Sequence, residues 1–293
     1  MRSAFLGVAL LLSWTAQAEP QKISIPSLDG RLQVPGYWFE AQADGRRPAV
    51  IELHGCGGAF DSRGRLIASV LRDARYFNLE RIHVLALDSF TPRGLGSICE
   101  IPVSRRSIGD DDRRADVYAA MQWLARQPSV DAARIAVVGR SNGGSAVLSI
   151  MDLSDEAVRG QPLRPRAAVA FYPACGRFAR MLRYELAAPL LLMIGELDDW
   201  TSARRCVELH EKVRRAHQQP GFELIVYPDS HHGFDGAGPL QIRKNLPTKS
   251  GSATVGGNLQ TRKIAYRRMF DFLSEQLDTP LRLAHDERFR GMK

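Results

Sequence analysis

The sequence predicts an α/β fold in which a mostly parallel sheet is flanked by helices, and three observations support this. Short, continuous apolar runs recur along the chain, as expected for strands that are buried on both faces. Stretches of helical character separate these runs, and such alternation is typical of a parallel sheet. The 293 residues are 44% hydrophobic and 25% charged. This composition is close to the globular average and excludes collagen-like, coiled-coil and largely disordered chains.

The elements are expected in the following order. An antiparallel strand pair occupies residues 22–40 and turns at Asp29-Gly30. Six further strands follow, at residues 49–54, 81–88, 134–139, 167–173, 190–195 and 222–227. Helices lie between and after them, at residues 65–75, 113–126, 143–153, 202–217 and 262–277. The Gly-rich, polar stretch 233–260 is expected to be a loop or lid, and residues 278–293 a peripheral tail.

The N-terminal 18 residues have the pattern of a cleavable secretory signal peptide. Arg2 supplies the positive start, and residues 5–12 form an apolar run that is much shorter than the ~20 residues of a membrane-spanning helix. Ala16-Gln17-Ala18 then gives a small-x-small cleavage site. We expect a periplasmic or secreted protein in which residues 19–293 form a single domain without a membrane span, although an uncleaved anchor is the alternative.

The balance of charge is basic, with 40 Lys and Arg against 32 Asp and Glu and a net charge of +8. Such a surface favours anionic partners, including nucleic acid. The arginines, however, are scattered along the chain and form no basic tract. We therefore expect a basic exported protein and no nucleic-acid partner.

The four cysteines are Cys56, Cys99, Cys175 and Cys206, and none lies in a CxxC pair. An even number in an exported chain indicates disulfides, for which three pairings exist, and four free thiols are the alternative. Loops that follow parallel strands emerge at the same edge of the sheet. On that basis we predict the bonds Cys56–Cys99 and Cys175–Cys206, with Cys56–Cys175 as the competing pairing.

The strongest chemical signal is Gly139-Arg140-Ser141-Asn142-Gly143, which matches G-x-S-x-G between an apolar strand and a helix. A sharp turn at this point lifts the serine out of the sheet, and small residues two before and two after it let the chains pass. An ordinary glycine turn and a phosphate-binding loop are the alternatives. Phosphate binding is disfavoured, because neither G-x-G-x-x-G nor a Lys-Ser/Thr pair is present.

A serine nucleophile needs a base and a carboxylate that orients it, in the chain order serine, acid, histidine. Strand 190–195 leads into the acidic segment ELDD at 196–199, and strand 222–227 is followed by His231 and His232. Both groups fall at the edge of the sheet where Ser141 is expected. The backbone N–H groups of Asn142 and Cys56 are the candidates for the oxyanion hole.

Some neighbouring residues are candidates for the substrate pocket. Trp200 and Phe234 flank the acid and the base, and local packing is their alternative role. Arg93 and Arg140 are candidates for binding a substrate carboxylate, or else structural arginines. His54 is expected to hold its loop rather than to act as a base. The two adjacent histidines lack a third ligand, so we expect no metal site.

With these residues in place, the chain resembles the dienelactone hydrolase family of α/β-hydrolases over roughly residues 49–236. The segments that carry the resemblance are HGCGG at 54–58, DSFTPRG at 88–94, GRSNGG at 139–144, FYPACG at 171–176, GELDDWT at 195–201 and HHGFD at 231–235.

The resemblance implies an α/β-hydrolase fold and assigns several roles. It selects Asp198 over Asp199 as the acid and His232 over His231 as the base, and it places Glu52 where a glutamate assists the founding members. Those members use a cysteine nucleophile, whereas this chain has Ser141, which favours a general serine-esterase chemistry.

We therefore expect an exported serine hydrolase that cleaves a small-molecule carboxylic ester or lactone through an acyl-enzyme, with no cofactor. A serine peptidase or acyltransferase would share the same residues. A non-catalytic exported binding module is the alternative from a different class.

Overall fold

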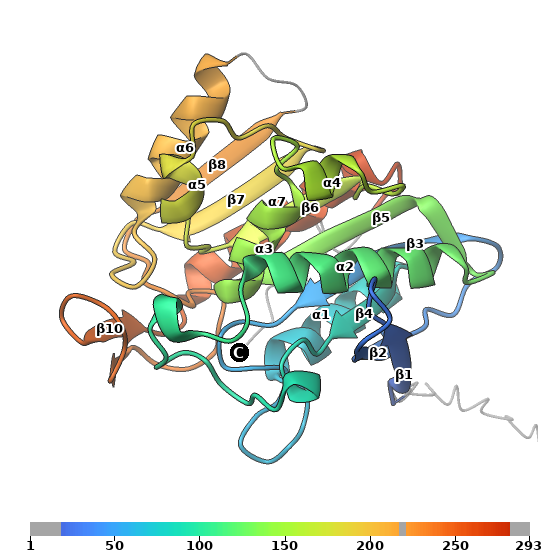
Figure 1. Cartoon of the computed structure of the whole chain (residues 1–293), viewed down its shortest axis with the longest axis horizontal. Helices are drawn as coiled ribbons and strands as arrows, with labels where there is room; N and C mark the ends of the chain where they lie inside the picture. Colours follow the sequence, from blue (N-terminus) through green and yellow to red (C-terminus); the bar gives the residue numbers. More distant parts are fainter. Residues whose placement is uncertain (1–18, 217–220, 282–293) are drawn as a thin grey trace, which may run out of the picture.

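An eight-stranded sheet forms the centre of the computed structural model, which describes residues 19–216 and 221–281 (Figure 1). The strand order is β1-β2-β4-β3-β5-β6-β7-β8. Strands β1, β2 and β4 are paired antiparallel, and every neighbouring pair from β4 to β8 is parallel. The strands are β1 (Gln21–Pro26), β2 (Gln33–Phe39), β3 (Arg47–Leu53), β4 (His83–Leu87), β5 (Val130–Arg140), β6 (Ala167–Phe171), β7 (Leu190–Gly195) and β8 (Phe222–Tyr227).

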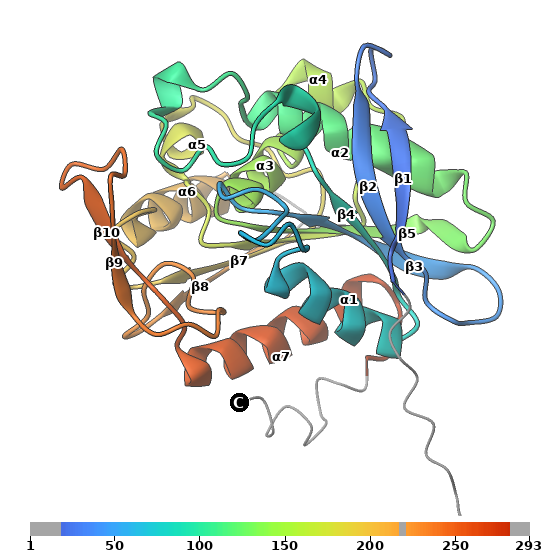
Figure 2. The same ribbon diagram turned by 90° about the horizontal axis from the view of Figure 1, so that it is seen from below.

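Helices cover both faces of this sheet. Figure 2 shows α1 and α7 on one face and α2, α3 and α6 on the other. The helices are α1 (Ala68–Leu79), α2 (Asp110–Ala125), α3 (Asn142–Ile150), α4 (Glu156–Arg159), α5 (Gly176–Arg180), α6 (Ala203–Arg215) and α7 (Leu259–Gln276). The predicted fold class, a mostly parallel sheet flanked by helices, is confirmed.

The central strands are apolar on both faces because helices cover both. Every residue of β6 and β7 is buried, and the sequences AAVAF and LLLMIG contain no charged side chain. Strand β8 lies at the edge of the sheet, and most of its residues are only partly buried. The parallel strands β3, β5, β7 and β8 all deliver their following loops to one edge, where the candidate site residues lie.

Several elements differ from the expected boundaries for local reasons. Helix α1 begins at Ala68 and not at residue 65, because the main chain and side chain of Arg65 bind the carboxylate of Asp61 in a turn (3.0 and 2.9 Å). Strand β5 begins at Val130, four residues earlier than expected, where Val130 pairs with Arg47 of β3. Residues 131–134 are partly or fully exposed, so the sequence shows no apolar run there.

The stretch 233–260, expected to be a loop or lid, contains a β-hairpin made of β9 (Gln241–Lys244) and β10 (Ser252–Val255). Figure 2 shows this hairpin outside the central sheet. Its strands are short and mostly polar, so the sequence carries no apolar signal for them. Buried Ala253 belongs to a small apolar cluster that also contains Cys56, Phe90 and Cys99.

Two disulfides are present, and they match the predicted pairing. Cys56 is bonded to Cys99, and Cys175 to Cys206, with Cα atoms 4.9 and 5.0 Å apart. The first joins the loop after β3 to the loop after β4. The second joins the N-terminus of α5 to α6.

The predicted signal peptide, residues 1–18, lies outside the described residues, as does most of the predicted tail, residues 282–293. Among the helices within residues 19–216 and 221–281, none has the length and apolar character needed to cross a membrane.

Candidate active site

Ser141 lies alone between the end of β5 and the start of α3, in a strained backbone conformation (φ 54°, ψ −115°). A non-glycine residue adopts a positive φ only where its surroundings enforce it. Here the enforcement is close backbone packing. A Cβ atom at Gly139 would lie 2.3 Å from the carbonyl oxygen of Gly143, and one at Gly143 would lie 2.3 Å from that of Leu53. The two glycines of the motif therefore permit the turn that presents the serine.

The structure brings Ser141 together with one acid and one histidine from the expected loops. The Oγ atom of Ser141 is 3.0 Å from Nε2 of His232, and Nδ1 of His232 is 2.9 Å from Oδ2 of Asp198. Asp198 follows β7, His232 follows β8, and both side chains are buried. A hydroxyl, an imidazole and a carboxylate thus form one continuous hydrogen-bonded chain.

The neighbouring acid and histidine make other contacts. The carboxylate of Asp199 accepts a hydrogen bond from the backbone N–H of Thr254 in the hairpin (2.9 Å), and Nδ1 of His231 lies 3.0 Å from the carbonyl oxygen of Leu197. The choice of Asp198 and His232 within each pair therefore agrees with the contacts.

Asp198 is held in one orientation by its own loop. Its Oδ1 atom accepts hydrogen bonds from the backbone N–H groups of Trp200 (3.0 Å) and Thr201 (2.7 Å). The Thr201 hydroxyl lies 2.9 Å from Asp198 Oδ2 and 3.0 Å from the carbonyl oxygen of Tyr172. Sequence analysis did not single out Thr201, although it ends the GELDDWT segment.

The two oxyanion candidates, Asn142 and Cys56, come from the helix after the serine and from the loop after β3. Asn142 is the first residue of α3, so its backbone N–H has no partner within the helix. Cys56 lines the cavity that contains Ser141. The preceding residue approaches closely, because a Cβ atom at Gly55 would lie 3.5 Å from the Cβ of Ser141. Both candidate residues thus lie close to Ser141.

His54 fixes the loop that carries Cys56. Its Nδ1 lies 2.8 Å from the carbonyl oxygen of Gly55, and its Nε2 accepts from the backbone N–H of Ser89 (3.4 Å). Burial, followed by the charge of Arg113, holds the pKa of His54 well below its ordinary value of 6.5. A neutral imidazole that bridges two segments has a structural role, as expected.

Arg113 places a positive charge behind the oxyanion candidates, and sequence analysis missed it. Its side chain is 1% exposed, and its Nη1 donates to Oδ1 of Asn142 (2.7 Å). The guanidinium also lies over the ring of Phe90, 5.3 Å from its centre. Burial lowers the pKa of Arg113 to about 10, so the group stays cationic at neutral pH.

A cavity of about 350 Å³ opens onto Ser141 and His232. Trp200 lines it, as expected, and the ring of Trp200 lies 4.8 Å from that of His232. The hairpin contributes further lining residues, namely Gln241, Arg243 and Val255. The hairpin is attached to the histidine loop, because Val255 forms a β-bridge with His232. The expected lid is therefore one wall of the cavity.

Three residues expected at the pocket lie elsewhere, and this corrects the expectation for each of them. Arg93 is bound by both carboxylate oxygens of Asp116 on α2 (2.9 Å each). Phe234 is fully buried in the core. Glu52 is 1% exposed and lies beneath the site, where its Oε2 binds Nη1 of Arg140 at 3.2 Å.

Arg140 is the centre of a buried charge cluster below the serine. Besides Glu52, it binds Asp235 through Nε (2.6 Å) and Asp73 through Nη2 (2.7 Å). Arg72 is the second cation and lies 3.4 Å from Asp235. Although burial opposes it, the charges of Arg140 and Arg72 keep the pKa of Asp235 below its ordinary value of 3.8. Arg140 also lines the cavity, but each of its three guanidinium nitrogens binds a carboxyl group of the cluster, so we assign the arginine a structural role.

Burial, together with repulsion from Asp73, raises the pKa of Glu52 well above its ordinary value of 4.5. The cluster holds three carboxyl groups and two guanidinium groups. A proton on Glu52 would bring the cluster to neutrality, which agrees with the raised pKa of this carboxyl group.

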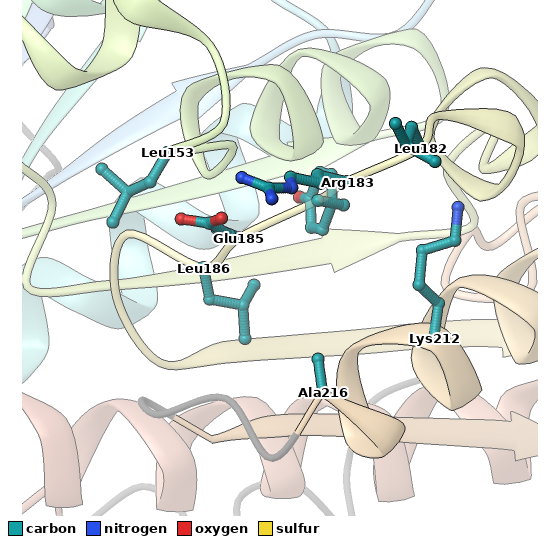
Figure 3. Close-up of a pocket in the computed structure, with 8 residues that line it drawn as sticks. Leu153, Leu182, Arg183, Glu185, Leu186, Lys212 and Ala216 are labelled. Atoms are coloured by element: carbon teal, nitrogen blue, oxygen red, sulfur yellow. The ribbon is translucent and has the colours of Figure 1, made fainter.

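A second cavity, of about 450 Å³, lies away from these residues (Figure 3). It is lined by Leu153, Lys212 and the segment 182–186, among others, and contains none of the residues discussed above. The Lys212 amino group donates to the backbone carbonyls of Ala179 (2.6 Å) and Met181. The lysine of this cavity thus fixes the end of α5.

Within residues 19–216 and 221–281, no group of three or more His, Cys, Asp or Glu residues could hold a metal ion.

The comparison with known families identifies the chain. A model of the dienelactone hydrolase family matches residues 104–277, more than half of the sequence. The chain belongs to the dienelactone hydrolase family. Family membership supports an ester or lactone hydrolase.

Curated relatives and solved structures extend this match. The "probable 2-oxo-3-(5-oxofuran-2-ylidene)propanoate lactonase" of Bradyrhizobium sp. is 24% identical over 204 residues, 65% of this chain and 74% of that protein. A protein designated a dienelactone hydrolase from Klebsiella pneumoniae has a TM-score of 0.61 at 20% identity and covers 87% of this chain and 98% of its own. Esterase 2 of Thermogutta terrifontis, phosphorylated by paraoxon, has a TM-score of 0.61 at 16% identity, with coverage of 89% and 95%. At these identities the two structures show the shared fold.

The raised pKa of Glu52 gives a pH-dependent prediction for Glu52→Gln. We expect the folded protein to keep a proton on Glu52 that the unfolded chain releases above the ordinary pKa of 4.5. Wild type therefore loses stability relative to the neutral variant as the pH rises above that value, by up to ~1.4 kcal/mol per pH unit. Denaturant unfolding of both proteins at pH 4.5, 6 and 7.5 measures the difference.

The control for this experiment is Glu52→Ala. It removes the partner of Arg140 and leaves a cavity, so we expect it to be less stable than Glu52→Gln at all three pH values. A difference between wild type and Glu52→Gln that stays constant with pH would show that Glu52 is ionised in the folded protein.

Proposed function

We propose that the chain is an exported serine hydrolase that cleaves a carboxylic ester or lactone, with Ser141, His232 and Asp198 as its catalytic triad. The observation that carries the proposal is the continuous hydrogen-bonded chain from Ser141 Oγ through His232 to Asp198. Membership of the dienelactone hydrolase family supports the class of reaction.

In the proposed mechanism, Nε2 of His232 takes the proton of Ser141 as Oγ attacks the carbonyl carbon of the substrate. Asp198 orients the imidazole and stabilises the imidazolium that forms. The N–H groups of Cys56 and Asn142 bind the oxyanion of the tetrahedral intermediate. His232 then protonates the leaving oxygen, and an acyl group remains on Ser141. A water molecule, deprotonated by His232, releases the acid and regenerates the serine.

The location and organisation of the chain are also part of the proposal. We propose that residues 1–18 are removed on export and that residues 19–293 form one hydrolase domain. The two disulfides support an oxidising compartment, since such bonds persist outside the cytosol.

The lining of the cavity supports a substrate that carries a negative charge. Arg243 projects from β9 into the lining and lies over the ring of Trp200, 5.4 Å from its centre. Among the described residues no carboxylate forms an ion pair with it, and the cavity lining contains no acidic side chain. A guanidinium in such a setting binds a carboxylate well. The Bradyrhizobium relative is named for a lactone that is a propanoate. We therefore propose a carboxylate-bearing ester or lactone.

Ser141→Ala tests the nucleophile. The variant should lose at least about a thousandfold in the hydrolysis of para-nitrophenyl butyrate, because removing a triad serine leaves only binding and the oxyanion hole. Wild type should be labelled by a fluorophosphonate probe and the variant should not. Circular dichroism checks that the fold is intact. A variant that keeps more than about a tenth of the wild-type rate contradicts the serine mechanism, and a chain that never labels is a binding module.

The adjacent histidines provide a matched pair of variants for the base. His232→Ala should lose activity to the same extent as Ser141→Ala, because the serine proton then has no acceptor. His231→Ala should stay within about threefold of wild type, since His231 contacts the Leu197 carbonyl and not the serine. Steady-state kinetics on the same ester decide between them, and the reverse result would reassign the base.

Arg243→Gln tests the substrate class. We expect kcat/KM for an anionic ester, para-nitrophenyl adipate, to fall about tenfold or more, while the neutral para-nitrophenyl butyrate is unaffected. Lys244→Gln, which removes the same charge from the next residue of β9, is the control and should change neither value. Equal effects of Arg243→Gln on both esters would argue against recognition of a carboxylate.

A further inference from the structure

The Cys56–Cys99 disulfide lies in the wall of the cavity that contains Ser141. Both cysteines line that cavity, and Cys56 is 8% exposed while Cys99 is 1% exposed. Cys56 is also the residue whose backbone N–H is the proposed oxyanion donor. One residue therefore carries both the donor and a covalent crosslink.

The crosslink is reinforced by the backbone on both sides. The carbonyl oxygen of Cys56 accepts a hydrogen bond from the N–H of Ile98 (2.9 Å). Gly58 adopts φ +89°, and a Cβ atom there would lie 2.3 Å from the carbonyl oxygen of Gly96. The loop at residues 55–58 is thus packed directly against residues 96–99. The position of the Cys56 amide depends on this second segment.

That second segment has little regular structure of its own. Between the end of β4 and the start of α2, residues 88–109 contain only two short 3₁₀ turns. The apolar side chains Ile98, Cys99 and Ile108 form a small cluster with Cys56, which is separate from the main core. A covalent bond is the strongest constraint that holds the two loops in register.

We propose that the Cys56–Cys99 disulfide is a positioning element of the oxyanion hole, which holds the Cys56 amide in place for the transition state. The inference rests on the proposed serine mechanism. An oxyanion donor acts only if it is fixed before the reaction, since a displacement of about 1 Å costs a large part of the rate. The disulfide supplies that fixation through the neighbouring loop.

The second disulfide offers a built-in control. Cys175 and Cys206 are 1% and 0% exposed, belong to the main apolar core and do not line the active-site cavity. Removing this bond should lower stability, because the unfolded chain gains freedom. It should leave the chemistry unchanged. The two bonds thus separate a positioning role from a stabilising one.

The experiment compares the double variants Cys56→Ser/Cys99→Ser and Cys175→Ser/Cys206→Ser on para-nitrophenyl butyrate, with the thermal midpoint of each. We expect the first to lower kcat and kcat/KM together by about tenfold to a hundredfold, which is the signature of an interaction made only in the transition state. The second should stay within about twofold of wild-type kcat at temperatures below its midpoint.

A glycine pair tests the same contact without touching a cysteine. Gly58→Ala forces a Cβ atom against Gly96 and should reproduce the loss of kcat. Gly64→Ala is the matched control, because Gly64 also has a positive φ (+73°), whereas a Cβ atom there would have no neighbour within 4 Å. It should lose some stability and no kcat. This pair decides the question if the first double variant does not fold.

Reduction of folded wild type gives a third test. A water-soluble phosphine cleaves a disulfide to two thiols, while water supplies the oxygen of the phosphine oxide and the two protons. Mass mapping after alkylation should show that Cys56 and Cys99 are modified first, in step with the loss of kcat, because only this bond faces the cavity.

Several results would overturn the inference. They are a kcat for Cys56→Ser/Cys99→Ser within about twofold of wild type, a loss confined to KM, an equal loss of kcat in both double variants, or free thiols at Cys56 and Cys99 in the oxidised protein. Failure of the proposed function is a separate outcome, which would appear as an active Ser141→Ala.

Discussion

The buried guanidinium of Arg140 is the interaction on which the rest of the site depends. It directly precedes Ser141 and binds carboxyl groups from three separate segments: Glu52 on β3, Asp73 on α1 and Asp235 in the loop that carries the histidine. A buried cation is tolerated only when it is paired. These segments therefore cannot move apart without leaving a charge unpaired in the core. The ion pairs of Arg140 therefore tie the segment that carries Ser141 to the loop that carries His232.

The charge cluster around Arg140 also explains the raised pKa of Glu52. Two guanidinium groups, from Arg72 and Arg140, face three buried carboxyl groups, and Arg72 is the partly exposed member of the cluster. One proton would bring the cluster to neutrality, and burial raises the pKa of Glu52 in the direction that favours a proton there. Glu52, which the family resemblance suggested as an assistant at the pocket, is buried beneath the site as a partner of Arg140. Arg113 is a further buried charge near the site. It binds the side chain of Asn142, a candidate oxyanion donor, and is not among the residues that line the cavity.

Much of this architecture could be predicted from the sequence, for physical reasons that also mark the limits. The bounds of strands β7 and β8 agree with the expectation, because β7 is a continuous apolar run and β8 is interrupted only by Glu223. The motif around Ser141 was predictable because the turn requires glycine on both sides. The partners of Arg140 were not, since a buried ion pair and an exposed arginine look alike in a sequence. Phe234 was misplaced for a similar reason, because an aromatic residue beside a catalytic loop carries no sign of which way it faces. The hairpin was missed because its strands are polar.

The hairpin has a consequence for how this protein diversifies. It is a single continuous segment, and backbone groups of β10 join it to the loops of the site. The Thr254 N–H donates to the Asp199 carboxylate, Val255 forms a β-bridge with His232, and the Gly256 N–H donates to the His232 carbonyl oxygen. These backbone groups do not depend on side-chain identity, whereas β9 contributes the side chains of Gln241 and Arg243 to the cavity lining. Substitutions in β9 therefore change the cavity lining, while Ser141, His232 and Asp198 keep their hydrogen bonds. Changes in this one short segment thus alter the shape and charge of the cavity without altering the residues around Ser141.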